Sequence, residues 1–324
     1  AGGHAGRRGE SLIPRPGRRA GCAALLAAGA AALVLAADSR PCAREPAPLL
    51  ARRWAEFAAG RPGRVIFARP PHMFLLDLST GSERQIPGVM VAGGPGRRLR
   101  GATPRPSWAP DGNRFCYRYD RRVYVCDREG RKRPILNPNM DCSDETRWSW
   151  ARRGEGDWLA GPGRNGDVIL VRVADPRDWL TAHGAGDVDK FCEVTGDGRF
   201  VVYDDGSQVR VAPFAGRRPG LAISRGQSCR PSASPVDRVA WLAAAHDRYR
   251  IHAAADGRFL GDLLAPPGEE IYRLSWSNLP GFVAHMFGSK GNTRMHVRDV
   301  GSGAALFIGC GWDPDLWLGA PPAP

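Results

Sequence analysis

The amino-acid sequence predicts an all-β protein, a six-bladed β-propeller that occupies residues 63–319. Three observations support this prediction. A turn recurs at intervals near 42 residues, and six strands with alternating apolar residues follow these turns at a similar spacing. The 41 glycines and 28 prolines are scattered along the 324 residues, which suits many short strands joined by turns.

The recurring turn is clearest in residues 106–127, PSWAPDGNRFCYRYDRRVYVCD. A short strand, a Pro-Asp-Gly turn, a β-rich strand, a second turn and an alternating strand together predict a three-stranded meander. Related turns at Gly112, Gly156, Gly198, Asp237 and Gly281 are separated by 44, 42, 39 and 44 residues, and Gly63 is a first, weaker echo of this turn. A period near 42 residues is typical of one propeller blade.

An alternating apolar strand follows each turn, and six such strands predict six blades. They are FLLDL from Phe74, VYVCD from Val123, VILVR from Val168, VRVAP from Val209, YRIHA from Tyr249 and MHVRD from Met295. One blade cannot bury both faces alone, whereas stacking around a ring covers them, so six matched units favour a propeller over a β-sandwich.

The two ends of the repeat region are predicted to share one blade. The first unit lacks a Pro-Ser-Trp equivalent before Gly63, and the segment with Trp312 and Trp317 is expected to supply this missing strand and to close the ring. Five further tryptophans at strand positions are expected to pack between blades: Trp108, Trp148, Trp150, Trp241 and Trp276.

The unit PSWAPDG followed by VYVCD resembles the TolB-type, WD40-like propeller repeat, whose typical form is Pro-x-Trp-Ser-Pro-Asp-Gly, a hydrophobic strand and Ile-Tyr-Val-x-Asp. The match is weaker in TGDGRFVVYDDGSQVRV and PSASPVDRVAWLAAAHDRYRI, and only the skeleton remains in the other units. The resemblance implies the six-bladed fold and no catalytic residues. Members of this family include periplasmic scaffolds, peptide-hydrolase propellers and sugar-acting lyases, so the fold does not specify a function.

The residues before the propeller predict export. Basic residues in the region 1–37 precede an uncharged apolar run from Ala20 to Ala37, which is the pattern of a signal peptide or a signal anchor. As a helix this run spans about 27 Å, close to the hydrocarbon thickness of a membrane. We expect the propeller outside the cytoplasm, periplasmic or anchored to the membrane if the run is not cleaved. A buried Ala-rich helix is the alternative.

The segment 38–62 is predicted to be a linker, and residues 320–324 a short tail. The resemblance does not extend to the amino-terminal domain that accompanies the propeller in TolB, and we expect no counterpart of it in the short segment 38–62.

The formal charge of +13 raises the question of nucleic-acid binding. Of the 46 basic residues only Lys132, Lys190 and Lys290 are lysines, an imbalance that resembles a bias in nucleotide composition. The sequence has neither a basic helix nor aromatic residues interleaved with basic ones, so nucleic acid is not an expected partner. We expect a monomer.

The sequence contains no recognisable catalytic motif: a Gly-x-Ser-x-Gly elbow, a phosphate-binding glycine loop and a His-Glu-x-x-His helix are all missing. His246, His285 and His296 lie on consecutive predicted blades, where they are candidates for a metal site or for packing. The sequence therefore indicates no particular cofactor and leaves a metal undetermined.

Four cysteines precede the predicted first strands of different blades, where equivalent positions converge around the axis: Cys142, Cys192, Cys229 and Cys310. These thiols are candidates for a zinc site, for disulfides or for packing. Separately, Cys116 and Cys126 lie almost symmetrically about a hairpin turn, and a disulfide between them depends on the strand register.

Acidic residues share this end of the predicted channel, and the candidate binding set combines them with the cysteines. It consists of Cys142, Asp144, Cys192, Glu193, Cys229, Glu270, Cys310 and Asp313. The predicted function is a non-catalytic propeller of the cell envelope that binds a protein segment or a small ligand at the channel mouth. The alternative is a lyase-like enzyme acting on carbohydrate, with a divalent metal at that mouth.

Overall fold

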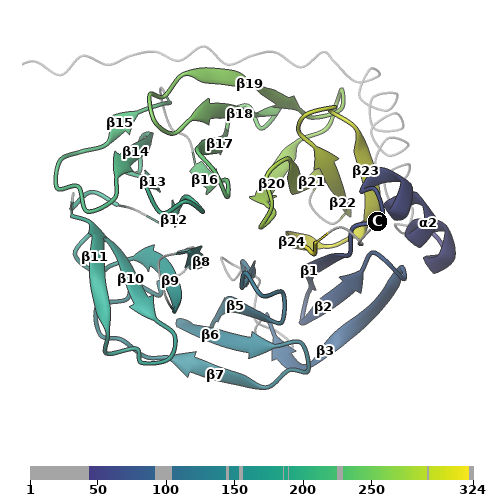
Figure 1. Ribbon diagram of the computed structural model, residues 1–324, viewed down its shortest axis with the longest axis horizontal. Helices are drawn as coiled ribbons and strands as arrows, with labels where there is room; N and C mark the ends of the chain where they lie inside the picture. Colours follow the sequence, from purple (N-terminus) through teal and green to yellow (C-terminus); the bar gives the residue numbers. More distant parts are fainter. Residues whose placement is uncertain are drawn as a thin grey trace, which may run out of the picture. The chain divides into compact units, whose positions relative to one another are not determined.

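The computed structural model describes residues 44–91, 104–143, 146–152, 156–184, 186–188, 190–224, 229–289 and 292–320. Within these ranges, six four-stranded antiparallel sheets surround a central axis (Figure 1). Each sheet has one strand near the axis and one at the rim, which is the arrangement of propeller blades. The predicted all-β fold with six blades is confirmed.

From the axis outward, the strands of the first three blades follow in order. Blade 1 contains β24 (Trp312–Leu318), β1 (Gly63–Arg69), β2 (His72–Asp77) and β3 (Ser82–Met90). Blade 2 contains β4 (Ser107–Trp108), β5 (Arg114–Tyr119), β6 (Arg122–Asp127) and β7 (Lys132–Ile135). Blade 3 contains β8 (Ser149–Arg152), β9 (Asp157–Pro162), β10 (Val168–Arg172) and β11 (Trp179–His183).

The other three blades have the same order. Blade 4 contains β12 (Cys192–Val194), β13 (Phe200–Asp204), β14 (Val209–Pro213) and β15 (Leu221–Ala222). Blade 5 contains β16 (Cys229–Ala233), β17 (Arg238–Leu242), β18 (Arg248–Ala253) and β19 (Phe259–Leu264). Blade 6 contains β20 (Ile271–Trp276), β21 (Phe282–Ser289), β22 (Asn292–Asp299) and β23 (Ala305–Cys310).

Both sequence landmarks fall at equivalent places in the blades. The six alternating strands are the third strands, β2, β6, β10, β14, β18 and β22. The recurring turns join the first strand to the second in blades 2 to 6. Glycine suits these turns because Gly112, Gly156, Gly198 and Gly281 have φ angles of 64°, 111°, 71° and 97°, a region that other residues rarely adopt.

The ring is closed by pairing the end of the chain with the first propeller strand. In the antiparallel pair of β24 and β1, Trp317 lies opposite Arg64, as predicted for a shared blade. The Trp317 indole donates a hydrogen bond of 3.0 Å to the carbonyl of Pro110. The indole of Trp317 packs so closely over Gly112 that a Cβ at this residue would lie 2.2 Å from Trp317 Cε2.

The hydrophobic core is divided among the junctions between blades. Six clusters of buried side chains occur in the described residues, and each combines residues of two neighbouring blades. Between blades 5 and 6, for example, Tyr249 and Leu263 pack with Leu274 and Phe287. Apolar burial therefore stabilises every junction of the ring rather than one centre.

A helix in the predicted linker covers the junction of blades 1 and 6. Helix α2 (Ala47–Phe57) buries Leu50 and Trp54, with Ala58 just beyond its end, and their spacing of four residues places them on one face. The Trp54 indole donates a 2.7 Å hydrogen bond to the Arg61 carbonyl. The residue pattern of the predicted linker does not indicate this helix.

The predicted signal or anchor segment, Ala20 to Ala37, lies outside the described residues. Within the part of the chain that the structure describes, no helix combines the length and apolar character needed to span a bilayer.

Candidate functional site

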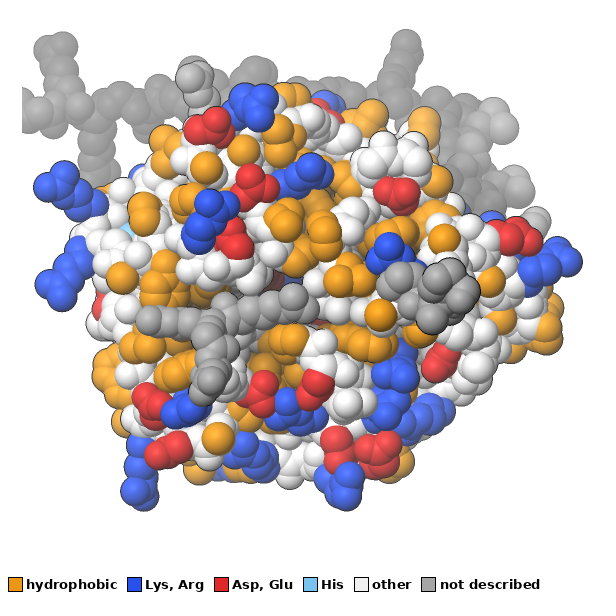
Figure 2. All heavy atoms as spheres, in the orientation of Figure 1, with side chains coloured by type: hydrophobic (Ala, Val, Ile, Leu, Met, Phe, Trp, Pro, Cys, Tyr) orange, Lys and Arg blue, Asp and Glu red, His pale blue; other side chains and the backbone are white. Residues whose placement is uncertain are grey.

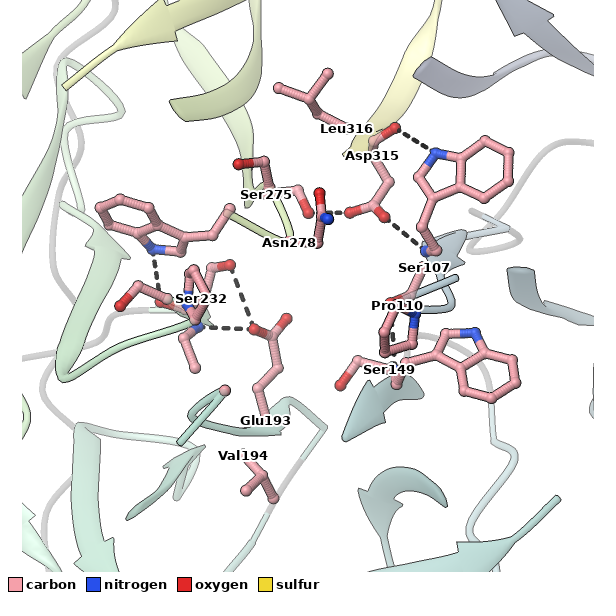
Figure 3. Close-up of a pocket in the computed structure, with 18 of the residues that line it drawn as sticks. Ser107, Pro110, Ser149, Glu193, Val194, Ser232, Ser275, Asn278, Asp315 and Leu316 are labelled. Carbon is pink, nitrogen blue, oxygen red and sulfur yellow. Dashed lines mark hydrogen bonds between the residues drawn. The ribbon is translucent and has the colours of Figure 1, made fainter. Parts of the chain in front are cut away.

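The inner strands of all six blades line a polar pocket of about 90 Å³ on the propeller axis (Figure 3). Two adjacent residues of every inner strand line the pocket, and their side chains point to opposite faces of the strand. The first residue of each pair occupies the equivalent position in every blade. We call this set the mouth ring: Ser107, Ser149, Glu193, Ser232, Ser275 and Asp315.

A second ring of side chains precedes the mouth ring by two residues along the chain. Its described members form the inner ring: Arg105, Arg147, Phe191, Arg273 and Asp313, each of them buried. The Arg105 guanidinium carbon lies 4.3 Å from the centre of the Phe191 ring. Arg273 Nε lies 2.9 Å from Asp313 Oδ1. These contacts join blade 2 to blade 4 and blade 6 to blade 1.

Arg147 connects the two rings. Its Nη1 lies 2.7 Å from Glu193 Oε1 in blade 4, and its Nη2 donates a 3.4 Å hydrogen bond to Ser275 Oγ in blade 6. Burial alone lowers the pKa of Arg147, but the carboxylates of Glu193, Asp315 and Asp313 outweigh this effect and raise it. Arg147 is therefore a fixed cation at the base of the pocket.

Glu193 is held by blade 5 through only one of its oxygens. Oε2 accepts hydrogen bonds from the Ala233 amide at 2.7 Å and from the Ser232 hydroxyl at 3.3 Å. Oε1 is close to Arg147 but accepts no hydrogen bond of acceptable angle from a described residue. This oxygen keeps capacity for a further donor.

Asp315 contacts the two blades that flank blade 1. Oδ2 accepts a 2.7 Å hydrogen bond from the Trp108 amide, and Oδ1 accepts one from the Ser275 hydroxyl (Figure 3). Burial raises the pKa of Asp315 to about 6, although Arg147 and these two hydrogen bonds act in the opposite direction.

Ser149 brings an unused hydroxyl to the pocket. The residue is 5% exposed, and its Oγ has no hydrogen-bond partner among the described residues. Buried polar groups are usually hydrogen-bonded, so this hydroxyl is available to a bound group. The pocket thus combines two carboxylates, one fixed guanidinium and several hydroxyls.

Two of the predicted binding residues lie on the axis. Glu193 belongs to the mouth ring and Asp313 to the inner ring. Glu270 is an exposed residue that precedes β20. Asp144 lies outside the described residues.

The structure does not gather the predicted cysteines into one described site. Cys192 precedes Glu193 by one residue and therefore faces the core between blades 3 and 4. Cys142 is half-buried against the cluster between blades 2 and 3. Cys310 ends the outer strand β23 and forms a disulfide, whereas Cys142 and Cys192 are free thiols. The side chain of Cys229, at the start of β16, is not described.

The hairpin disulfide considered for Cys116 and Cys126, which depends on the strand register, does not form, and both thiols are free. Cys116 pairs with Val125, and Phe115 pairs with Cys126. This offset of one residue directs the two thiols to opposite faces of the sheet, where they enter different core clusters.

The serines of the mouth ring are not among the binding residues predicted from the sequence. A Ser-Trp pair recurs at the inner strands of three blades, at 107–108, 149–150 and 275–276. The tryptophans were assigned to packing between blades, and Trp108 and Trp276 lie in such clusters with Trp150 packed against another. The serine before each tryptophan has the opposite orientation, so this repeat was the available signal for the ring.

The histidines considered for a metal are packed in the blades. The rings of His285 and His296 stack at 5.5 Å on neighbouring strands, whereas His246 contacts Tyr272. Burial lowers the pKa of His296 to about 4 and that of His285 well below its usual range. Among the described residues, no group of three or more histidine, cysteine or acidic side chains is placed to hold a metal.

Comparison with known proteins identifies the fold. A chain of a nidogen/laminin complex matches with a TM-score of 0.58 and 8% identity, over 80% of this chain and 99% of that one. TolB from Acinetobacter baumannii matches with a TM-score of 0.57 and 12% identity, over 83% of this chain and 71% of that one. A putative TolB from Agrobacterium tumefaciens matches with a TM-score of 0.55 and 11% identity, over 80% of this chain and 98% of that one.

No protein-family model and no curated protein sequence matches the chain. The structural matches establish the propeller fold and are consistent with the TolB-like resemblance of the repeat.

Proposed function

Starting from the six-bladed propeller fold that the chain shares with TolB structures, we propose that this protein is a binding platform whose axial pocket receives a segment of a partner protein. The observation that carries the proposal is the pocket itself, in which residues from all six blades surround a polar cavity of about 90 Å³. Pockets for small molecules usually exceed about 300 Å³, so this volume suits one inserted side chain better.

The surroundings of the pocket support this proposal. Residues of the turns that follow the inner strands, including Pro110, Pro235 and Asn278, also line the cavity. When one side chain of a bound segment enters the mouth ring, the rest of that segment can contact these turns. Packing on both sides holds each blade in place, and a preorganised site of this kind loses little entropy on binding.

We also propose that the protein is exported. This proposal is supported by the basic residues before the uncharged run from Ala20 to Ala37. A fusion of residues 1–62 to a reporter enzyme that is active only outside the cytoplasm tests it, and an inactive fusion would contradict export. No observation in the described residues favours the metal-dependent lyase alternative.

A matched pair of variants tests binding at the pocket. Pro235 and Pro280 occupy the equivalent turns of blades 5 and 6, but Pro235 lines the pocket whereas Pro280 is exposed and does not. Pro235→Trp should therefore obstruct the mouth, and Pro280→Trp should leave it open.

The measurement begins with selection of random displayed peptides on the purified protein. The affinities of individual peptides for the wild type and for both variants are then compared by fluorescence polarisation. We expect Pro235→Trp to weaken binding by about tenfold or more, because contacts in the pocket are lost, and Pro280→Trp to have no effect. The proposal is wrong if no peptide binds, or if every binder tolerates Pro235→Trp.

A further inference from the structure

We infer, on the basis of the proposed function, that the axial pocket selects a cationic side chain, a lysine ammonium or an arginine guanidinium, from the partner segment. The inference concerns the chemistry of the inserted group. It depends on three features of the described residues: an acidic side chain without an ion pair, unused acceptors beside it, and a molecular charge that opposes non-specific attraction of cations.

The first feature is the charge of the pocket lining. Three ionisable residues line the cavity, the base Arg147 and the acids Glu193 and Asp315. Arg147 is paired with Glu193 at 2.7 Å. Asp315 accepts hydrogen bonds from the Trp108 amide and the Ser275 hydroxyl but makes no ion pair with any described residue. Arg147 faces Asp315 but makes its close ion pair with Glu193, so it compensates the buried Asp315 carboxylate only in part. An incoming cation would supply a closer counter-ion.

The second feature is the set of acceptors that remain. Within the described part of the chain, Ser149 Oγ is buried without a partner, and Glu193 Oε1 accepts no well-aligned hydrogen bond. An ammonium offers three donors and a guanidinium five, and neither offers an acceptor. A cationic group that enters the mouth ring can therefore donate to the carboxylates and to the serine hydroxyl together.

An anionic side chain fits this lining less well. Arg147 Nε is a buried donor without a partner among the described residues, which an anion could in principle use. That anion would also lie beside the carboxylates of Glu193 and Asp315, and like charges at close range oppose binding.

The third feature is the charge of the whole chain. A formal charge of +13 repels cationic peptides at long range. Figure 2 shows basic side chains spread over the visible face of the molecule. Long-range attraction therefore cannot explain a preference for cationic peptides. If such a preference is measured, it must come from the residues that line the pocket.

The test uses three short probes that differ in one side chain: acetyl-Gly-Arg-Gly-amide, its citrulline analogue and its glutamate analogue. Citrulline has nearly the shape of arginine without the charge. Binding to the full chain is measured by titration calorimetry or ligand-observed NMR. We expect the arginine probe to bind about tenfold or more tightly than the citrulline probe, and the glutamate probe to bind least.

Two variants locate the effect. Asp315→Asn removes the charge but keeps an acceptor for the Trp108 amide, and it should reduce the preference for arginine over citrulline by about tenfold. Asp256→Asn removes one exposed carboxylate in the turn before β19 and should leave the preference unchanged. Pro235→Trp should abolish binding of the arginine probe.

The outcomes separate the inference from the function on which it depends. Equal binding of arginine and citrulline by the wild type, or preferred binding of glutamate, overturns the inference, and this comparison needs no variant to fold. If displayed peptides occupy the pocket without enrichment in lysine or arginine, the proposed function stands and the cationic selectivity is wrong. If no displayed peptide occupies the pocket, the proposed function itself fails.

Discussion

Asp315 links three blades through one carboxylate. It belongs to β24 in blade 1 and accepts hydrogen bonds from Trp108 in blade 2 and Ser275 in blade 6. Arg147 and Glu193 also face it on the axis. Because burial raises its pKa to about 6, the folded protein holds this proton more tightly than the unfolded chain, where the pKa is near 3.8.

The raised pKa of Asp315 predicts a pH-dependent contribution to stability. A folded pKa above the unfolded value gives stability that is complete below about pH 4 and is lost as the pH rises through about 6. The shift corresponds to roughly 2–3 kcal/mol. Asp315→Asn should lack this contribution, because asparagine does not titrate.

Urea unfolding of the wild type and of Asp315→Asn at several pH values measures this difference. The free energy of unfolding of the wild type, relative to that of the variant, should fall between about pH 4 and about pH 7. A constant difference across this range would contradict the buried setting of Asp315.

Orientation within the inner strands is what sequence analysis could not determine. Glu193 and Asp313 both lie near predicted first strands; Glu193 lines the axial pocket, and Asp313 pairs with Arg273 of the inner ring. Cys192 also lies near a predicted first strand, yet it faces the core because it is one residue away from Glu193. Inner strands as short as Ser107–Trp108 give too few residues for an alternating pattern to establish which side chains face the channel.

At the scale of elements, long amphipathic strands were predictable and the docked helix was not. The third strands show apolar alternation over five to eight residues, which reports their half-buried setting. In α2, Arg52 and Arg53 interrupt the apolar residues Leu50 and Trp54, so the segment resembles a polar linker until the propeller surface is known. Its partner surface is formed by residues distant in the sequence, which local patterns do not report.

The turn between β4 and β5 gives a prediction at this scale. At Gly112 a Cβ would lie 2.2 Å from Trp317, whereas at the equivalent Gly281 no described atom lies within 4 Å of the added carbon. Both glycines have positive φ, so alanine strains the backbone at either position. We expect Gly112→Ala to destabilise the protein by about 2 kcal/mol more than Gly281→Ala, because only the former displaces Trp317.

Chemical denaturation of the two variants measures this difference. Combining Gly112→Ala with Trp317→Leu should recover part of the loss, since the smaller side chain leaves room for the methyl group. Equal effects of the two alanine variants would show that Trp317 does not restrict the turn.

At the scale of the whole molecule, the ring depends on one strand that joins its two ends. The period near 42 residues predicted the number of blades, and the missing first strand predicted the closure, because both follow from the requirement that every blade face be covered. The polar pocket on the axis follows from closure as well, since β24 supplies Asp315 to the mouth ring.

Removing β24 should open the ring. A chain that ends at Gly311 loses the buried Leu316 and Leu318 and leaves β1 unpaired on one edge. Each buried leucine contributes about 2 kcal/mol, so we expect loss of most of the stability and of a single cooperative unfolding transition. A chain that ends at Ala320 keeps β24 and serves as the control. Calorimetry distinguishes them, and a cooperative transition of normal midpoint after truncation at Gly311 would contradict closure by β24.

The pairing of β24 with β1 also has a consequence during synthesis. The ribosome makes residues 63–69 early, but their partner, residues 312–318, is among the last parts of the propeller to emerge. A nascent chain must therefore keep one edge of its first sheet unsatisfied while five other sheets are produced. Export is proposed above, and a chain that crosses the membrane before its ring closes would benefit from a delay of this kind, because it stays competent for translocation.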